Sequence, residues 1–360
     1  MGSTTQIADG SSYAPTAKST KVVQPGDFTF AAAFLDHGHI YGQVNGLIDA
    51  GATLKSVYDP DPKKLSQFLA TYPQAKAADS YAAILQDSEI QLIAAAAIPN
   101  QRAPLGWQAL NAGKDYFTDK SPFTSMEQLA TTRELVHKTG QKYMAYYSER
   151  LHNDAAWQAG KLIQDGAIGK VLHVLTLAPH RLSKSTRPDW FFDKQQYGGI
   201  LTDIGSHQVE QFLTYSGCSN ATVISARATN FNNPDKPELE DFGEFALLGD
   251  NGASFYARVD WFTPSGQSAW GDGRTFILGT KGSIEIRKYL DVARSAPSSK
   301  LFMTTSESEQ EIECLDKTGF PFFGELILDC LHRTELAMSQ THTFKAAELS
   351  MLAQQLADSN

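Results

Sequence analysis

The first part of the chain alternates short apolar runs with segments of helical pattern. Short apolar runs between turn residues indicate buried strands, and apolar residues spaced three and four apart indicate helices that bury one face. Their alternation is typical of a parallel sheet covered by helices on both faces. The expected strands are Phe28–Leu35, Leu54–Tyr58, Ile90–Ile98, Asp115–Thr118 and Lys142–Tyr146, and the expected helices are Tyr41–Asp49, Lys63–Tyr72, Ser80–Gln86, Pro104–Ala112 and Ser125–Thr139.

The pattern changes near residue 149. Asp154–Asp165 still has a helical pattern, but residues beyond 220 alternate apolar and polar side chains with a period of two, as in Ser254–Trp261. Turn-forming residues at 249–252 and 279–282 separate such runs. This part therefore predicts an antiparallel sheet with one covered face, closed by helices at Gly324–Met338 and Lys345–Ala357.

These patterns predict a two-domain α/β protein. Residues 26–148 are expected to form a Rossmann-like domain with a parallel sheet, and residues 149–360 an α+β domain with a large, open, mainly antiparallel sheet. Residues 1–25 are rich in Ser, Thr, Ala and Gly and are expected to form a disordered tail. They lack the basic start and apolar core of a signal peptide.

Charge and cysteine content exclude several classes of protein. The net charge is −9 and no dense stripe of Lys and Arg occurs, so neither nucleic acid nor an anionic membrane is an expected partner. No apolar run approaches the length of a membrane span. Cys218, Cys314 and Cys330 are widely spaced and odd in number, which favours free thiols in a reducing compartment, the cytoplasm, over disulfides or a zinc cluster.

The segment Gly198–His207 reads Gly-Gly-Ile-Leu-Thr-Asp-Ile-Gly-Ser-His and carries the most informative polar pair. On a helix, Asp203 and His207 would lie on one face, one turn apart. A nearby carboxylate stabilises the imidazolium that forms when a general base accepts its proton. The simpler alternative is an Asp–His pair on the surface.

The first strand leads into Leu35–Gly42, where a dinucleotide fingerprint would place glycine at 36, 38 and 41. Only Gly38 fits, and Gly42 is displaced by one position. Close backbone approach at Gly38 and the following helix N-terminus still permit a pyrophosphate site, with a plain strand–helix turn as the alternative. Asp59 ends the second strand, where an acid would bind the ribose hydroxyls and repel a 2′-phosphate; helix capping or a turn is the alternative.

With these residues in view, the chain from about residue 28 onward resembles the Gfo/Idh/MocA family of oxidoreductases. The resemblance rests on Pro99-Asn100, on Gly113–Pro122 around the fifth strand, on Gly198–His207 and on a hairpin at Gly279–Gly282. The chain departs from the family pattern in its glycine loop, in Asp119 where the family has Glu, and in Ser121 inserted before Pro122. The histidine that follows Pro-Asn in the family is also absent, and Arg102 and Ala103 stand in that region.

The resemblance implies a site. Lys120 would hold the reacting hydroxyl and favour its ionised form, His207 would take the hydroxyl proton, and Asp203 would orient substrate or raise the basicity of His207. The substrate would also contact Arg150, His180 and Trp190. The residues assigned to the cofactor, NAD in preference to NADP, are Asp36, His37, Gly38, His39, Ile40, Asp59, Pro99, Asn100, Asp119 and Lys120.

The function that follows is NAD-dependent hydride transfer between nicotinamide and the hydroxyl carbon of a sugar, polyol or sugar acid. Redox-neutral glycoside cleavage or epimerisation with NAD, and a ligand-binding relative without turnover, remain alternatives. A metal-dependent sugar isomerase on a (β/α)₈ barrel is disfavoured by the period-two runs. His37 and His39 flank Gly38 without a third ligand in spacing, so no metal site is predicted. Members of the family pair such open sheet faces, so the resemblance implies a homodimer or homotetramer through the C-terminal sheet.

Overall fold

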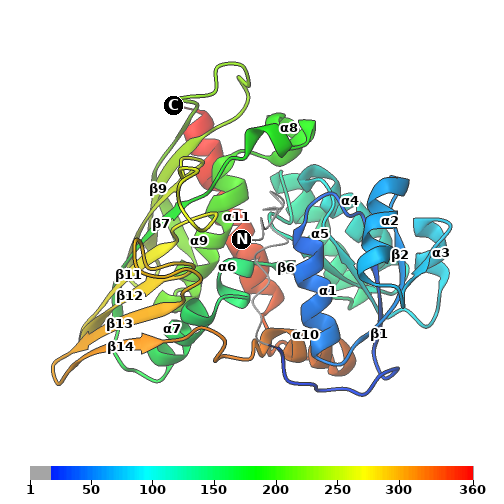
Figure 1. Ribbon diagram of the computed structural model, residues 1–360, viewed down its shortest axis with the longest axis horizontal. Coiled ribbons are helices and arrows are strands. Elements are labelled where there is room, and N and C mark those ends of the chain that lie inside the picture. The colour runs from blue at the N-terminus through cyan, green and yellow to red at the C-terminus, as the bar shows by residue number, and fades with distance from the viewer. Residues whose placement is uncertain (1–17, 360) are drawn as a thin grey trace. The chain divides into compact units, whose positions relative to one another are not determined.

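Two sheets organise the chain, one in each of two units (Figure 1). The computed structural model describes residues 18–359, so residues 1–17 of the expected tail lie outside the described residues. The first unit runs to Tyr146 and also includes residues 185–187 and 319–340; the second holds residues 147–184, 188–318 and the C-terminal residues from 341. The division after Tyr146 lies two residues before the boundary that the sequence pattern suggests.

The first unit contains a six-stranded parallel sheet in the order β3-β2-β1-β4-β5-β6. This order reverses direction between β1 and β4, and ligands of such sheets bind at that switch point, beyond the carboxyl ends of the strands. The predicted Rossmann-like sheet is confirmed, and it gains one short strand that carries no clear pattern, β3. The strands are β1 (Thr29–Ala33), β2 (Thr53–Tyr58), β3 (Lys76–Ala77), β4 (Leu92–Ala95), β5 (Asp115–Asp119) and β6 (Tyr143–Tyr146).

The helices of the first unit follow its strands in turn. Asp61, Ser80 and Ser125 each accept a backbone hydrogen bond at the start of a helix, which explains where α2, α3 and α5 begin. Helix α4 starts five residues before its predicted Pro104 because Pro99 can occupy a first turn. The helices are α1 (His39–Asp49), α2 (Pro62–Thr71), α3 (Tyr81–Gln86), α4 (Pro99–Asn111) and α5 (Met126–Thr139).

The helix predicted at Gly324–Met338 does not close the second sheet. It is α10 (Phe322–His332) and belongs to the first unit, where Phe323 packs so closely on Gly46 of α1 that a Cβ there would clash with its ring. Ser19 is buried and donates a hydrogen bond to the Phe320 carbonyl. Residues from 18 onward of the expected disordered tail therefore pack on this unit.

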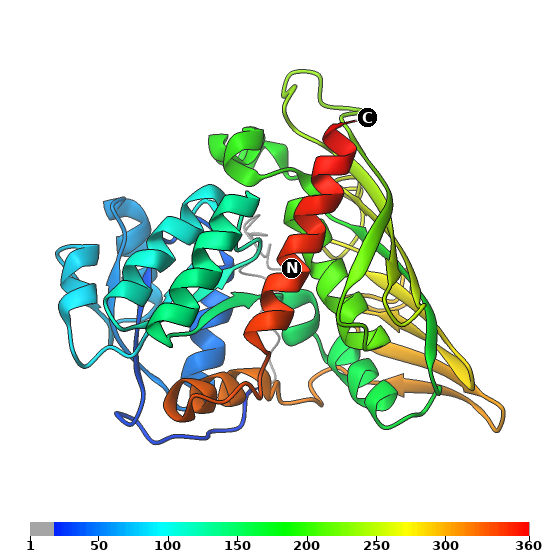
Figure 2. The ribbon, with the colours of Figure 1, turned by 180° about the vertical axis from the view of Figure 1, so that it is seen from behind.

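The second unit contains an eight-stranded sheet in the order β14-β13-β12-β11-β7-β10-β9-β8 (Figure 2). Strands β7 and β10 run parallel and every other pair is antiparallel, so the predicted mainly antiparallel sheet is confirmed. The strands are β7 (Val171–Pro179), β8 (Ala221–Thr229), β9 (Phe242–Gly249), β10 (Ser254–Asp260), β11 (Arg274–Gly279), β12 (Gly282–Arg287), β13 (Lys300–Thr305) and β14 (Glu309–Glu313).

Within residues 18–359, helices of the second unit cover one face of this sheet. Helix α9 (Ile200–Ser216) packs on β7, β9 and β10, and α7 (Asp154–Gln164) packs on β12 and β13. Phe245, Leu247 and Phe255 are buried on this inner face. Their neighbours on the outer face, among them Leu248, Phe276 and Leu278, are exposed. The remaining helices of this unit include α6 (Ser148–Leu151), α8 (Lys194–Tyr197) and α11 (Gln340–Asp358).

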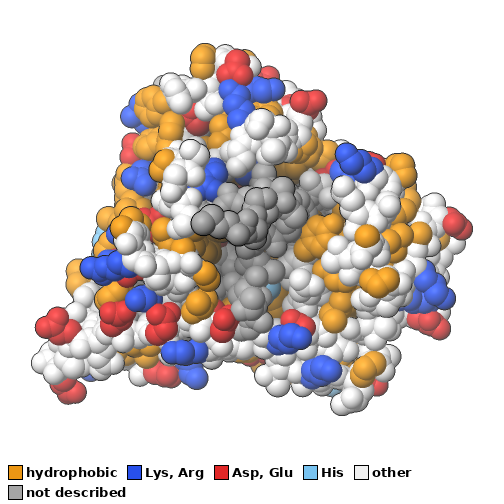
Figure 3. Space-filling model, viewed as in Figure 1, with side chains coloured by type: hydrophobic (Ala, Val, Ile, Leu, Met, Phe, Trp, Pro, Cys, Tyr) orange, Lys and Arg blue, Asp and Glu red, His pale blue; other side chains and the backbone are white. Residues whose placement is uncertain are grey.

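Three predictions from composition can be compared with this structure. No helix within residues 18–359 is long and apolar enough to cross a membrane. Cys218, Cys314 and Cys330 are all buried and free, as expected. On the face of the molecule drawn in Figure 3, acidic and basic side chains are interspersed rather than gathered into a basic patch.

Candidate active site

The loop after β1 is held in place by backbone and side-chain bonds within the first unit. Gly38 is the N-cap of α1, and the His37 amide donates to the Ala96 carbonyl beyond β4. Asp36, whose charge would repel a pyrophosphate, forms an ion pair with Lys64 of α2 at 2.5 Å. The loop therefore keeps a helix N-terminus with its carboxylate neutralised, although two fingerprint glycines are missing.

Asp59 is nearly inaccessible at the end of β2. Its two oxygens accept hydrogen bonds from the Leu35 amide at 2.6 Å and the Asp61 amide at 2.8 Å. Burial raises the pKa of Asp59, and these two backbone donors partly oppose that rise. Asp59 therefore stabilises a turn before α2, whose N-cap is Asp61, and a contact of Asp59 with a ribose stays a prediction.

Asp119, at the end of β5, is the centre of a buried polar cluster. Its Oδ1 lies 2.8 Å from His39 Nδ1, and its Oδ2 lies 3.3 Å from His37 Nδ1 and 3.1 Å from Arg102 Nη2. The side chain is fully buried. Burial alone would raise the pKa of Asp119, but His39 and Arg102 outweigh it and hold that pKa far below its usual range.

Sequence reasoning missed Arg102 as a site residue. Its guanidinium, 1% exposed, donates to Asp119 and also to the carbonyls of Ala97, Lys120 and Ser121. The fork geometry of arginine suits several fixed acceptors at once. Arg102 therefore fixes the backbone that carries Lys120. The signal available in the sequence was its place two residues after Asn100, where the family pattern has another basic residue.

His37, His39 and Asp119 offer donor atoms within 4.8 Å of one another, a spacing that metal ligands also have. The charges around them do not favour a cation, since the carboxylate already binds Arg102. Burial, then His39, Lys120 and Arg102, lower the pKa of His37 well below its usual value even though Asp119 opposes this. The prediction of no metal therefore stands unchanged as a prediction.

In the second unit, the motif Gly198–His207 forms a turn and the first half of α9. Gly198 and Gly199 both have positive φ, 89° and 91°, and a side chain at Gly199 would collide with Gln354 of α11. Asp203 and His207 lie one turn apart on α9, as predicted, and are 8% and 2% exposed. Both are buried, which rules out the alternative of a surface Asp–His pair.

Glu149 of α6 is the buried carboxylate of the second unit. Its Oε2 accepts from Lys288 Nζ at 2.8 Å and from Gln208 Nε2 at 3.0 Å, and its Oε1 lies 3.5 Å from His180 Nε2. Burial would raise the pKa of Glu149, but Lys288, His207 and His180 outweigh it and keep that pKa far below normal. Lys288 follows β12, and no sequence signal marks it as a site residue.

Arg150, which was expected to contact the substrate, forms an ion pair within the second unit. Its Nε lies 2.8 Å and 3.0 Å from the two oxygens of Glu210 on α9. Burial opposes ionisation of Glu210, but Arg150 and His342 lower its pKa to about 2. This pair ties α6 to α9, and a substrate contact of Arg150 stays a prediction.

His180 and Trp190 follow β7, as expected. The His180 ring is nearly buried, with Nδ1 3.1 Å from the Ala178 carbonyl and its ring centroid 4.6 Å from that of Trp270. Trp190 lies in a short 3₁₀ turn, Asp189–Phe192, and contacts Phe191 edge-on at 5.9 Å.

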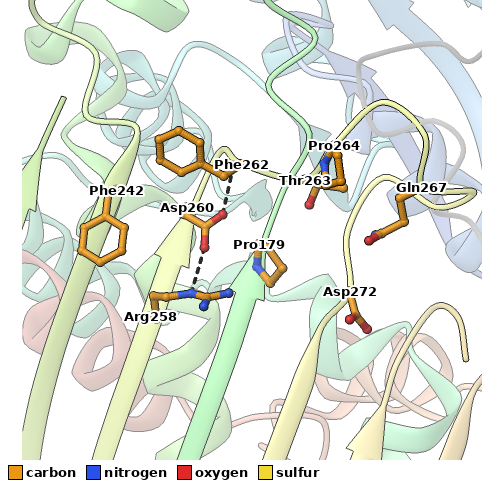
Figure 4. A pocket seen from close by; sticks show the side chains of 9 residues that line it. All are labelled: Pro179, Phe242, Arg258, Asp260, Phe262, Thr263, Pro264, Gln267 and Asp272. Atoms are coloured by element: carbon orange, nitrogen blue, oxygen red, sulfur yellow. Dashed lines mark hydrogen bonds and ion pairs between the residues drawn. The ribbon is translucent and has the colours of Figure 1, made fainter. Parts of the chain in front are cut away.

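A pocket of about 340 Å³ lies at the ends of β7 and β10 (Figure 4). Two of its lining residues, Arg258 and Asp260 of β10, form an ion pair at 2.9 Å. None of the predicted site residues lines it. The lining residues are Pro179, Phe242, Arg258, Asp260, Phe262, Thr263, Pro264, Gln267 and Asp272.

Both units of the chain match models of known protein families. Residues 32–147 match the family described as an oxidoreductase family with an NAD-binding Rossmann fold, and residues 157–285 match the GFO/IDH/MocA C-terminal domain. The crystal structure of a protein described only as an oxidoreductase, from Erwinia carotovora atroseptica SCRI1043, is 48% identical. The match covers 92% of this chain and 99% of that chain, with a TM-score of 0.89.

The chain belongs to the Gfo/Idh/MocA oxidoreductase family. A fission yeast relative, the uncharacterised oxidoreductase C26H5.09c of Schizosaccharomyces pombe, is 26% identical over 221 residues. That match covers 61% of this chain and only 58% of the relative. Levoglucosan dehydrogenase in complex with NADH and levoglucosan is 15% identical with a TM-score of 0.77, covering 93% of this chain and 98% of that one, and shares the fold.

The first unit of this family member fits a dinucleotide. The amides at the start of α1 follow β1 at the switch point of the sheet, and Arg102 adds positive charge there. Within the described residues, the buried side-chain oxygens of Asn100 and Ser121 have no hydrogen-bond partner. Both follow strand ends at the same sheet edge, where a ligand can satisfy them.

Proposed function

We propose that this protein is an NAD-dependent dehydrogenase that acts on a hydroxyl carbon of a sugar, polyol or sugar acid. The observation that carries the proposal is the buried pair Asp203 and His207 on α9, within a motif that matches the family pattern completely. Burial of two titratable groups one turn apart costs folding free energy, and such groups are concentrated at functional sites.

The residues of the chain divide the work of the reaction. Lys120 holds the reacting hydroxyl with its ammonium group and favours the ionised oxygen. An imidazole nitrogen of His207 takes the hydroxyl proton, and Asp203 stabilises the resulting imidazolium or orients a second hydroxyl. Arg102 and Asp119 keep the backbone of Lys120 in place. NAD, when bound, supplies the hydride acceptor.

The cofactor would be held by the first unit. The loop residues Asp36, His37, Gly38, His39 and Ile40 surround the start of α1. Pro99, Asn100, Asp119 and Lys120 follow strands β4 and β5 at the same edge. We propose NAD rather than NADP, because Asp36, Asp59 and Asp61 place three acidic groups near Lys64.

Incubation of the protein with NAD and a panel of aldoses, inositols, sugar acids and glycosides tests this function. Absorbance of reduced nicotinamide and product mass are followed in parallel. Net NADH with oxidised product supports a dehydrogenase. Product without NADH selects redox-neutral cleavage or epimerisation, and binding without product selects a non-catalytic relative.

We also propose that the protein forms a homodimer or homotetramer through the outer face of its second sheet. Phe276 and Leu278 of β11 are 40% and 50% exposed there, and Leu175 of β7 lies opposite Phe276. Apolar patches of this kind mark interfaces. Light scattering at micromolar concentration should show an oligomer for the wild type and a monomer for Leu278→Lys. Glu127→Lys, in the exposed first turn of α5, should leave the oligomer intact.

A further inference from the structure

Four polar side chains from four separated segments meet at one buried point of the second unit. Glu149 comes from α6, His180 follows β7, Gln208 lies on α9 and Lys288 follows β12. The ammonium of Lys288 is completely buried, and Glu149 is 3% exposed. A buried ion pair is a poor source of stability, because removing both charges from water costs about as much as their attraction returns.

The surroundings of Glu149 indicate what the pair is for. Gln208, which donates to Glu149, is the residue directly after His207 on α9, and His207 is among the groups that lower the pKa of Glu149. His180 faces Glu149 with Nε2, while its Nδ1 faces the Ala178 carbonyl. A carbonyl can only accept, so a protonated His180 would donate from both nitrogens.

We propose that Lys288 and Glu149 form a charge-balancing pair that sets the protonation state of His207 and His180. Glu149 is then a positioning residue of the candidate active site. Its carboxylate alone would favour two imidazolium ions, and the buried ammonium of Lys288 cancels most of that effect. His207 is thereby left neutral near pH 7, as a general base must be. The catalytic meaning rests on the proposed function, whereas the electrostatic effect does not.

The other charged and titratable groups around these imidazoles come from a few elements. Tyr147, before α6, places its ring 6.3 Å from that of His207, and burial raises the pKa of Tyr147, so it stays neutral. Asp203 lies one turn away on α9. Glu210, three residues on, is neutralised by Arg150 and His342. Of the groups described in the second unit, Glu149 and Lys288 are therefore the two whose removal should change the charge near these imidazoles most directly.

Histidine titration by NMR in the full-length protein, labelled with ¹³C at Cε1 of histidine, tests the pair without any substrate. His207→Gln and His180→Gln assign the two resonances. Glu149→Gln leaves the Lys288 cation and should lower the midpoints of both imidazoles by about one pH unit or more. Lys288→Met leaves the carboxylate and should raise them by a similar amount. The double variant should titrate close to the wild type.

Arg287→Met is the matched control. Arg287 is the next residue in the chain, but it pairs with Glu285 and Asp291, so its loss should not move either imidazole. If Lys288→Met does not fold, Glu149→Gln against the double variant still decides, since only the former should shift. Unchanged midpoints in Glu149→Gln, or shifts of one sign in both single variants, would overturn the proposal.

The pH dependence of turnover separates this inference from the proposed function. Once a substrate is found, Lys288→Met should lose turnover at pH 7 by about tenfold and regain it at higher pH, because a base whose midpoint has risen is mostly protonated at pH 7. Glu149→Gln should keep its turnover to lower pH than the wild type. Shifted imidazoles with an unshifted turnover profile would support the charge pair and contradict the role of His207 as the base.

Discussion

The two units of this protein each bury one carboxylate among a permanent cation and two histidines. Asp119 of the first unit contacts Arg102, His37 and His39. Glu149 of the second contacts Lys288 and His180, and His207 also lowers the pKa of Glu149. The difference lies in the cation. Arg102 also binds three backbone carbonyls, whereas Lys288 brings a compact point charge to the carboxylate. One cluster therefore shapes the main chain, and the other adjusts imidazole charge.

The largest effect should be on turnover, when the proposed catalytic residue next to each cluster is removed: Lys120 in the first unit and His207 in the second. His207→Ala and Lys120→Ala should each lower turnover by about 10²–10⁴ and leave NAD affinity nearly unchanged, since a positioned acid–base group contributes that much. Steady-state kinetics and titration calorimetry measure the two effects. His137→Ala, at an exposed position of α5, is the control. Near wild-type turnover in both variants would contradict the site.

The second largest effect should be on the free energy of unfolding, and it should differ between variants of Arg102 and variants of Lys288. Arg102→Met removes the guanidinium that pairs with buried Asp119 and leaves three backbone carbonyls without this donor, so it should cost about 3–5 kcal/mol of unfolding free energy. Denaturant unfolding measures it. In the double variant Arg102→Met with Asp119→Asn, the carbonyls remain unsatisfied and much of the cost should remain. Lys288→Met alone should also lower the free energy of unfolding, but the double variant Lys288→Met with Glu149→Gln should recover most of that loss. Equal recovery in both pairs would contradict the difference drawn between them.

The same contrast explains what the sequence could predict. Asp203 and His207 were predictable because one helix carries both at a spacing of four, and Lys120 because it follows a strand in a family motif. The contacts of Arg102 and Lys288 were not, because tertiary structure sets their partners; the sequence marks only the place of Arg102 after Asn100. Lys288 lies 139 positions from Glu149 in the chain, and no local pattern encodes that contact. The place of α10 was missed for the same reason, since its partner Gly46 belongs to a distant helix.

A smaller effect should appear in cofactor choice, for which we propose that acids of the first unit are responsible. NAD should bind more tightly than NADP by about 1–3 kcal/mol, because a 2′-phosphate would meet Asp59 and its acidic neighbours in a partly dry site. Titration calorimetry with both nucleotides measures the difference, and Asp59→Asn should reduce it. Lys288→Met changes a charge only in the second unit and should leave it as it is. Equal or reversed affinities would remove the role assigned to Asp59.

The smallest effect separates the two clusters by acid sensitivity. The pKa of His37 lies well below its usual 6.5 because of burial and of His39, so the unfolded chain takes up this proton first as pH falls. Stability from a neutral His37 is therefore full above pH 6.5 and declines below it, by at most about 1.4 kcal/mol per pH unit. Glu149 and Glu210 have pKa values below their usual 4.5, so their contributions to stability persist until the pH falls below that value.

Hydrogen exchange between pH 7 and 5, corrected for intrinsic rates, should show β1 and α1 losing protection before α9 does. His37→Gln should abolish that difference, and a wild-type protein whose two units lose protection together would show that His37 is not the group responsible.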